Sequence, residues 1–141
     1  MSDASTRDEE RAAAKARGEQ IIKALKVILP TLWAFDDTAD PRVRDRRSST
    51  RPSYGQSAVT ALLVQELVGG HLMFCMSVDG ERRYANDVHW DAFDLMPDWF
   101  NSESIVADGT LVDPEDILRD DPTLMTRYAE FRRRALQQAL V

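Results

Sequence analysis

Apolar residues fall on one helical face from position 21 onward. Their spacings of three and four residues are typical of a helix that buries one side. The residues on this face are Ile22, Leu25, Ile28, Leu29 and Leu32. Pro30 suits the first turn of a helix because it has no backbone N–H to donate. We therefore predict that a short second helix begins there and carries Trp33 and Phe35.

Residues 1–20 form a charged extension ahead of a single domain that we place at residues 21–141. Thr6 and Glu9 have the spacing of a capping box, which predicts a helix start there and disorder over residues 1–5. The helix exceeds what a compact domain needs, and two interpretations are open. It pairs with the same helix of a second copy to give a homodimer, or it is a solvated helix that frays.

The centre of the chain predicts one buried helix followed by a small sheet. Residues 57–68 are apolar on nearly all sides, as in a buried helix, and Gly69 and Gly70 end the segment. Asp79-Gly80 is a hairpin signal. Antiparallel strands are predicted at residues 71–78, 81–88 and 92–95.

Polar segments flank this centre. We predict loops at residues 36–53 and 101–116, a helical turn at 97–100, and a last helix beginning at Asp121-Pro122. Its apolar stripe consists of Leu124, Tyr128, Phe131, Leu136 and Leu140. We place its arginines mostly on the solvent side: Arg127, Arg132, Arg133 and Arg134. A helix, a buried helix, a small antiparallel sheet and a closing helix define an α+β domain.

Composition and charge argue against several classes of function and of cellular location. The 141 residues suit one domain, and a net charge of −6 argues against a nucleic-acid partner, which needs a basic face. One cysteine excludes a zinc site built on four thiolates, two histidines argue against a histidine-rich metal site, and we expect no cofactor. The charged start is unlike a secretory signal, and no apolar run is long enough for a membrane. We expect a cytoplasmic protein.

The start of the buried helix is the place where chemistry is expected. Ser57 is its first residue and follows a Tyr54-Gly55-Gln56 turn. Backbone N–H groups and the helix dipole at this end favour a nucleophile and can hold an oxyanion. A cysteine here would gain a lowered pKa, whereas a serine needs a neighbouring general base.

Short segments in a fixed order then resemble a known family. They are Gly55-Gln56-Ser57, Val59-Thr60-Ala61-Leu62, Val64-Gln65-Glu66, Gly69-Gly70, Arg83-Tyr84-Ala85-Asn86, Asp94-Leu95-Met96, Trp99-Phe100 and Arg127-Tyr128. From about Leu29 to its end, the chain resembles the YunG-like proteins, whose arrangement is similar to that of the transglutaminase-like (papain-like) cysteine hydrolases. The resemblance implies a core with the nucleophile helix packed on the sheet.

The resemblance also implies a catalytic triad of cysteine, histidine and aspartate, at positions where this chain has Ser57, Arg83 and Asp94. Two of the three are replaced, and arginine stays protonated near pH 7, so Arg83 cannot be a general base. It can pair with Asp94 instead. This favours a catalytically inactive relative that binds a protein or peptide partner.

Two alternatives stay open. One is an active serine-dependent hydrolase or acyltransferase that uses His89 as its base, and the other is a thiol enzyme whose cysteine at position 57 was exchanged for serine. We assign candidate binding roles to Tyr54, Gln56, Asn86 and Trp90. For Gln56 we weigh an oxyanion or amide contact against a helix cap or a contact to the neighbouring loop.

Overall fold

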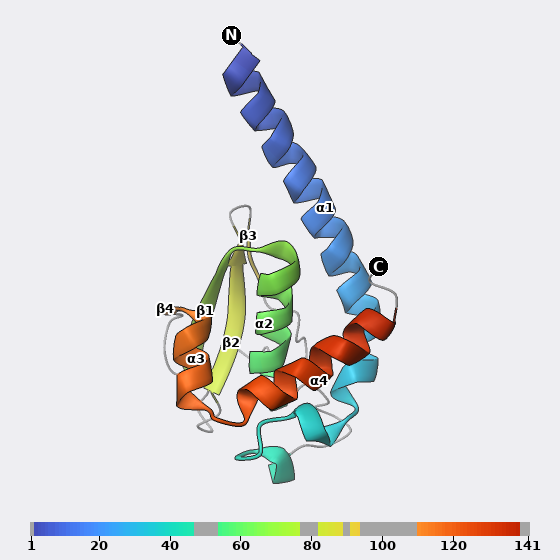
Figure 1. Ribbon diagram of the computed structural model, residues 1–141, viewed down its shortest axis with the longest axis vertical. Coiled ribbons are helices and arrows are strands. Elements are labelled where there is room, and N and C mark those ends of the chain that lie inside the picture. Colours follow the sequence, from blue (N-terminus) through green and yellow to red (C-terminus); the bar gives the residue numbers. More distant parts are fainter. Residues whose placement is uncertain (1, 47–53, 77–81, 89–90, 94–109, 139–141) are drawn as a thin grey trace.

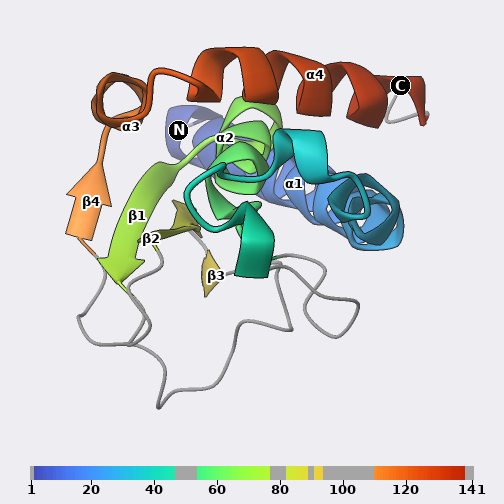
Figure 2. The same cartoon turned by 90° about the horizontal axis from the view of Figure 1, so that it is seen from below.

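A computed structural model of the chain describes residues 2–46, 54–76, 82–88, 91–93 and 110–138 (Figure 1). Helix α2 (Ser57–Val68) lies at the centre of the molecule. It contacts strand β2 (Arg82–Val88) on one side and the helices α1 (Ser2–Trp33) and α4 (Leu124–Gln137) on others (Figure 2). This surrounding explains why the segment is apolar on nearly all sides. The predicted buried helix and the α+β class are confirmed.

The sheet has the strand order β3-β2-β1-β4, and each neighbouring pair is antiparallel. Strand β1 (His71–Met76) pairs with β2 in a register that puts Phe74 opposite Tyr84. Strand β3 (Asp91–Phe93) extends the sheet beyond β2. The three predicted strands are therefore present, and β3 begins one residue earlier than predicted. The predicted strand ends at residues 77–78, 81 and 94–95, the hairpin signal at 79–80 and the helical turn at 97–100 lie outside the described residues.

Part of the loop predicted at 101–116 is wrong. Strand β4 (Thr110–Val112) pairs with β1, and the short helix α3 (Pro114–Asp120) follows it. A three-residue strand among turn-forming residues carries too weak a local signal, and its long-range pairing with β1 decides the conformation. The helix did have a signal, since Pro114 occupies its first turn and the backbone N–H of Asp113 donates to the Asp116 carboxylate at 3.3 Å.

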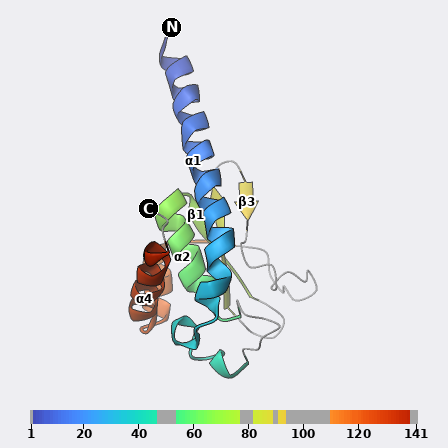
Figure 3. The same ribbon diagram turned by 90° about the vertical axis from the view of Figure 1, so that its right-hand side faces the viewer.

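Helix α1 corrects two further predictions, because it is continuous from Ser2 and includes Pro30. The predicted disorder before Thr6 and the predicted new helix at Pro30 are therefore wrong, apart from residue 1, which is not described. Pro30 faces solvent, and Leu29, Leu32 and Trp33 around it are buried. Their packing offsets the loss of one helical hydrogen bond at the proline. The N-terminal part projects from the body (Figures 1 and 3).

The core lies where α2 meets α1, α4 and the sheet. The indole N–H of Trp33 donates to the Thr60 hydroxyl at 2.9 Å and links α1 to α2 inside this core. Its fully buried large side chains include Leu25, Leu29, Leu63, Leu72, Leu124 and Phe131. Within the described ranges, no helix is both long and apolar enough to span a bilayer.

Candidate functional site

The turn into α2 requires glycine at position 55. Gly55 has a φ of 80°, which is the left-handed region, and a Cβ there would lie 3.2 Å from Val43 Cγ2. Its carbonyl accepts a hydrogen bond of 2.9 Å from the backbone N–H of Asp40. The loop after α1 is thereby held against the residues that lead into the helix.

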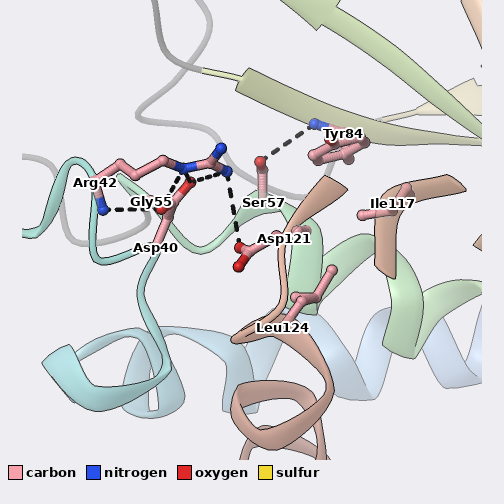
Figure 4. Close-up of a pocket in the computed structure, with 9 residues that line it drawn as sticks. Asp40, Arg42, Gly55, Ser57, Tyr84, Ile117, Asp121 and Leu124 are labelled. Carbon is pink, nitrogen blue, oxygen red and sulfur yellow. Dashed lines mark hydrogen bonds and ion pairs between the residues drawn. The ribbon is translucent and has the colours of Figure 1, made fainter. Parts of the chain in front are cut away.

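Ser57 opens α2 and is almost fully buried, with 2% of its surface exposed. Its hydroxyl oxygen accepts a hydrogen bond of 3.2 Å from the backbone N–H of Tyr84 on β2 (Figure 4). The ring of Tyr84 packs on Phe74, with centroids 5.4 Å apart. The structure therefore brings the predicted nucleophile position directly to the strand that the resemblance selected.

Gln56 binds the neighbouring loop rather than capping the helix. Its amide N–H donates to the Phe35 carbonyl at 2.8 Å, and its amide oxygen accepts from the Thr38 hydroxyl at 3.0 Å. The side chain is fully buried and makes no capping hydrogen bond. Both ends of the amide thus connect the start of α2 to the segment after α1, and a role toward a ligand stays a prediction.

Two other predicted binding residues are also buried. Asn86 donates to the Ala61 carbonyl at 3.0 Å, which ties β2 to the second turn of α2. Tyr54 is buried beside the turn. Both side chains are packed inside the protein, and a role toward a ligand stays a prediction.

The remaining candidates are only partly visible. The backbone of Arg83 pairs with Cys75 next to Tyr84 in β2, and its side chain lies outside the described part. Asp94, Trp90 and His89 lie outside the described residues altogether. The triad-like set and the alternative base His89 therefore stay predictions.

A buried ion-pair network was not predicted and lies beside the site. Asp121, at the end of α3, is 8% exposed and forms an ion pair with Arg127 of α4, which is 5% exposed. Arg127 also donates to the Thr38 carbonyl at 3.0 Å and to the Thr123 hydroxyl at 3.0 Å. The prediction that Arg127 lies on the solvent side is wrong, because α4 turns it toward the core, where Asp121 neutralises its charge.

A signal for this burial was present in the sequence. Arg127 stands three residues after Leu124 and four before Phe131, and both are buried. The helical period therefore placed it on the apolar face, and only its residue type suggested otherwise. Arg132 and Arg133 are exposed as predicted.

Arg42 extends the network to the surface. Its guanidinium forms hydrogen bonds of 2.8–3.1 Å with Asp40 and lies 3.7 Å from the Asp121 carboxylate. Burial by itself raises the pKa of Asp121, but hydrogen bonds from Thr123 and the charge of Arg127 outweigh it, so the pKa of this carboxyl is below its usual value. The carboxylate is ionised and paired at neutral pH.

A small cavity of about 10 Å³ separates Ser57 from this network. It is lined by Asp40, Arg42, Gly55, Ser57, Ala58, Tyr84, Ile117, Asp121 and Leu124 (Figure 4). This volume is about that of one water-sized probe. Among the residues that the structure describes, no group of three His, Cys, Asp or Glu side chains is placed to hold a metal ion.

The family follows from a comparison with protein-family models. The model of the YunG protein family matches residues 21–140. This chain belongs to the YunG family. The match includes α2, the sheet and α4 and begins where the charged extension was predicted to end. Neither the curated proteins nor the solved structures contain a match to this YunG chain.

The YunG domain has a second and larger hollow, of about 720 Å³, beside α4. Its lining residues come from α4 and from the short 3-10 helix η1 (Asp36–Thr38). They are Asp37, Met125, Thr126, Arg127, Ala129, Glu130 and Arg133. Met125 leaves 67% of its surface exposed and gives the hollow an apolar part.

Proposed function

We propose that this YunG-family chain is a catalytically inactive relative of the transglutaminase-like cysteine hydrolases and acts as a binding module for a protein or peptide partner. The transglutaminase-like part rests on the motif resemblance around α2. The observation that supports the inactive state is the burial of Ser57. Its hydroxyl is buried, accepts the Tyr84 backbone N–H, and faces a cavity of about 10 Å³.

The chemistry of the neighbouring groups supports the same conclusion. A serine hydroxyl needs a base with a pKa near the working pH. The position that the resemblance assigns to the base is Arg83, and arginine does not deprotonate near pH 7. Asp121 lines the cavity, but its pKa is lowered, which makes it a weak base.

Two surfaces support the binding part of the proposal. The hollow on α4 has a volume within the range of roughly 300–1,000 Å³ typical of ligand sites. It combines the apolar Met125 with the charged Glu130 and Arg133, a mixture suited to a peptide. The projecting part of α1 offers a second surface, and we propose it as the contact of a homodimer. We place the protein in the cytoplasm, in keeping with its single cysteine.

Labelling with a fluorophosphonate probe tests the inactive state. We expect no labelling of the wild-type chain above that of Ser57→Ala. Labelling that disappears in Ser57→Ala would establish an active serine nucleophile and refute the proposal. A phosphonate adduct is identified by mass spectrometry of the intact chain, so it does not depend on knowing a substrate.

The thiol alternative has its own test. Ser57→Cys is treated with iodoacetamide at several pH values, and the intrinsic Cys75 is controlled by the wild-type chain. We expect the new thiol to react slowly at neutral pH, since position 57 is buried. Rapid alkylation at neutral pH would show a site built for a thiolate and favour an enzyme.

A further inference from the structure

We propose that the cavity between Ser57 and Asp121 is a binding site for one water molecule, held by the Asp121 carboxylate, the Arg42 guanidinium and the Ser57 hydroxyl. The size of the cavity is the first observation. A volume of about 10 Å³ is the size that one water-sized probe occupies. The inference concerns the hydration of the chain and does not rest on the proposed partner.

The distance between Arg42 and Asp121 is the second observation. Arg42 Nη2 lies 3.7 Å from Asp121 Oδ2, beyond the range of about 2.7–3.2 Å for a direct hydrogen bond. A polar contact longer than about 3.5 Å leaves both groups able to share a water molecule. Both residues line the cavity and therefore border the same space.

The acceptor capacity of Asp121 is the third observation. Oδ1 accepts from the Thr123 backbone N–H at 2.9 Å and from its hydroxyl at 2.7 Å, while Oδ2 is bound by Arg127. A carboxylate offers about four acceptor positions, and these contacts use three of them. Asp121 can therefore accept one hydrogen bond from a water.

The lining distinguishes a wet cavity from a dry one. Cavities with purely apolar walls stay empty, whereas polar walls bind water. Ile117 and Leu124 form an apolar side, and Asp40, Arg42, Ser57 and Asp121 form a polar side. Figure 4 shows Arg42, Asp121 and Ser57 around the same space. The molecule thus offers the two to four polar partners that a buried water needs.

The charge balance selects water over a cation. Asp40 and Asp121 are already matched by the guanidinium groups of Arg42 and Arg127. A cation would add an uncompensated positive charge, while water is neutral and both donates and accepts. Any group that entered this cavity would have to replace the hydrogen bonds of the water.

A high-resolution crystal structure of the full chain tests the site directly. We expect one electron-density peak within hydrogen-bond distance of the Asp121 carboxylate and of Ser57 Oγ. An empty cavity in the wild-type map overturns the inference. A peak with the short distances of a metal ion, near 2.0–2.4 Å, overturns it in favour of a cation.

Matched variants add a second measurement. Ser57→Thr keeps the hydroxyl and adds a methyl group to a space for one water, while Thr60→Ser removes a methyl group from the same helix outside the cavity lining. Oxygen-17 relaxation dispersion counts long-lived internal waters in solution. We expect the count to fall by one in Ser57→Thr and to stay unchanged in Thr60→Ser.

An equal count in the wild type and Ser57→Thr, with the peak still present, would refute the inference. Should Ser57→Thr fail to fold, Ser57→Ala removes one of the three partners with no added volume. We then expect a lower occupancy of the peak at the same position. The wild-type density decides the question in either case.

Discussion

Arg127 and Arg133 belong to the same helix, yet α4 places them in opposite surroundings. Arg127 is 5% exposed and is bound by Asp121, Thr123 and the Thr38 carbonyl. Arg133 faces solvent and pairs with Glu130 one turn earlier. This difference in burial predicts that loss of the Arg127 pair leaves a buried charge and costs stability, whereas water can replace the Arg133 pair at little cost.

Arg134 lies between these extremes. It forms hydrogen bonds of 2.7 and 2.8 Å with Asp37, lies 3.0 Å from Glu130, and stacks over the Phe35 ring at 4.4 Å. Its side chain is 19% exposed, whereas Asp37 is largely solvated. The C-terminal half of α4 is thereby attached to the segment that follows α1. The three arginines define a series of decreasing burial on one helix.

The largest effect is expected for Arg127→Met. Methionine fills a similar volume but leaves the buried Asp121 carboxylate without its partner. We expect a loss of about 3–5 kcal/mol in the free energy of unfolding, the usual cost of breaking a buried pair. Urea denaturation followed by circular dichroism measures it, with Arg133→Met as the control. Equal stability of the two variants would contradict the expectation that the buried Arg127 pair contributes more to stability than the exposed Arg133 pair.

The pH dependence of the free energy of unfolding should also show the contribution of the buried Asp121–Arg127 pair. The folded-state pKa of Asp121 is lowered, so its contribution is complete above the unfolded-state value of about 3.9 and is lost as the pH falls through the lower folded-state value. One such proton gives a slope of at most about 1.4 kcal/mol per pH unit. Urea denaturation at a series of pH values from neutral to well below the unfolded-state value measures this slope.

Asp121→Asn serves as the comparison in that experiment. It removes the titrating group, so its stability should fall less steeply with acid than that of the wild-type chain. Asp37→Asn is a control at an exposed carboxylate whose pKa is also lowered, chiefly by hydrogen bonds from Arg134. A parallel decline in Asp121→Asn and the wild type would show that Asp121 does not carry the effect.

A smaller effect is expected for Arg134→Ala. The variant loses a partly solvated ion pair and the contact with the Phe35 ring, which together are worth roughly 1 kcal/mol. Adding 1 M salt should reduce the difference from the wild type, because salt screens exposed pairs more than buried ones. The same salt should leave the cost of Arg127→Met nearly unchanged. If salt changed the stability cost of Arg134→Ala and of Arg127→Met by the same amount, the expected difference between an exposed and a buried ion pair would be refuted.

The smallest effect is expected for Arg133→Ala. Both Arg133 and Glu130 reach solvent, which replaces the lost contact at little cost. We expect a urea midpoint within the experimental error of the wild type. A clear destabilisation would mean that Arg133 has a structural role that its exposure does not indicate.

Local pattern was enough to predict the elements that carry the site. The apolar segment after Gln56 became α2 with the expected ends, because a helix surrounded by other elements must be apolar on most sides. Strands β1 and β2 were predicted from strand-forming segments on either side of a hairpin signal. Strand β4 was missed, since three residues gain their conformation only from pairing with β1.

The site was predictable in position but not in its partners. The motif order pointed to Ser57 and to the strand segment around Tyr84, and these two residues are joined by a hydrogen bond. The loop contacts of Gln56 and the network around Asp121 depend on segments far apart in the chain. No spacing rule predicts such contacts, because they arise only when loop, helix and sheet pack together.

The sequence by itself determined an α+β domain with a buried helix that begins at a serine, because helical and strand periods are local properties of the chain. Tertiary structure alone decided that Arg127 is a buried partner of Asp121 and that the space before Ser57 is a cavity of about 10 Å³. Burial and closure depend on which surfaces meet. Their energies come from removing charges and apolar area from water, and that occurs only in the packed molecule.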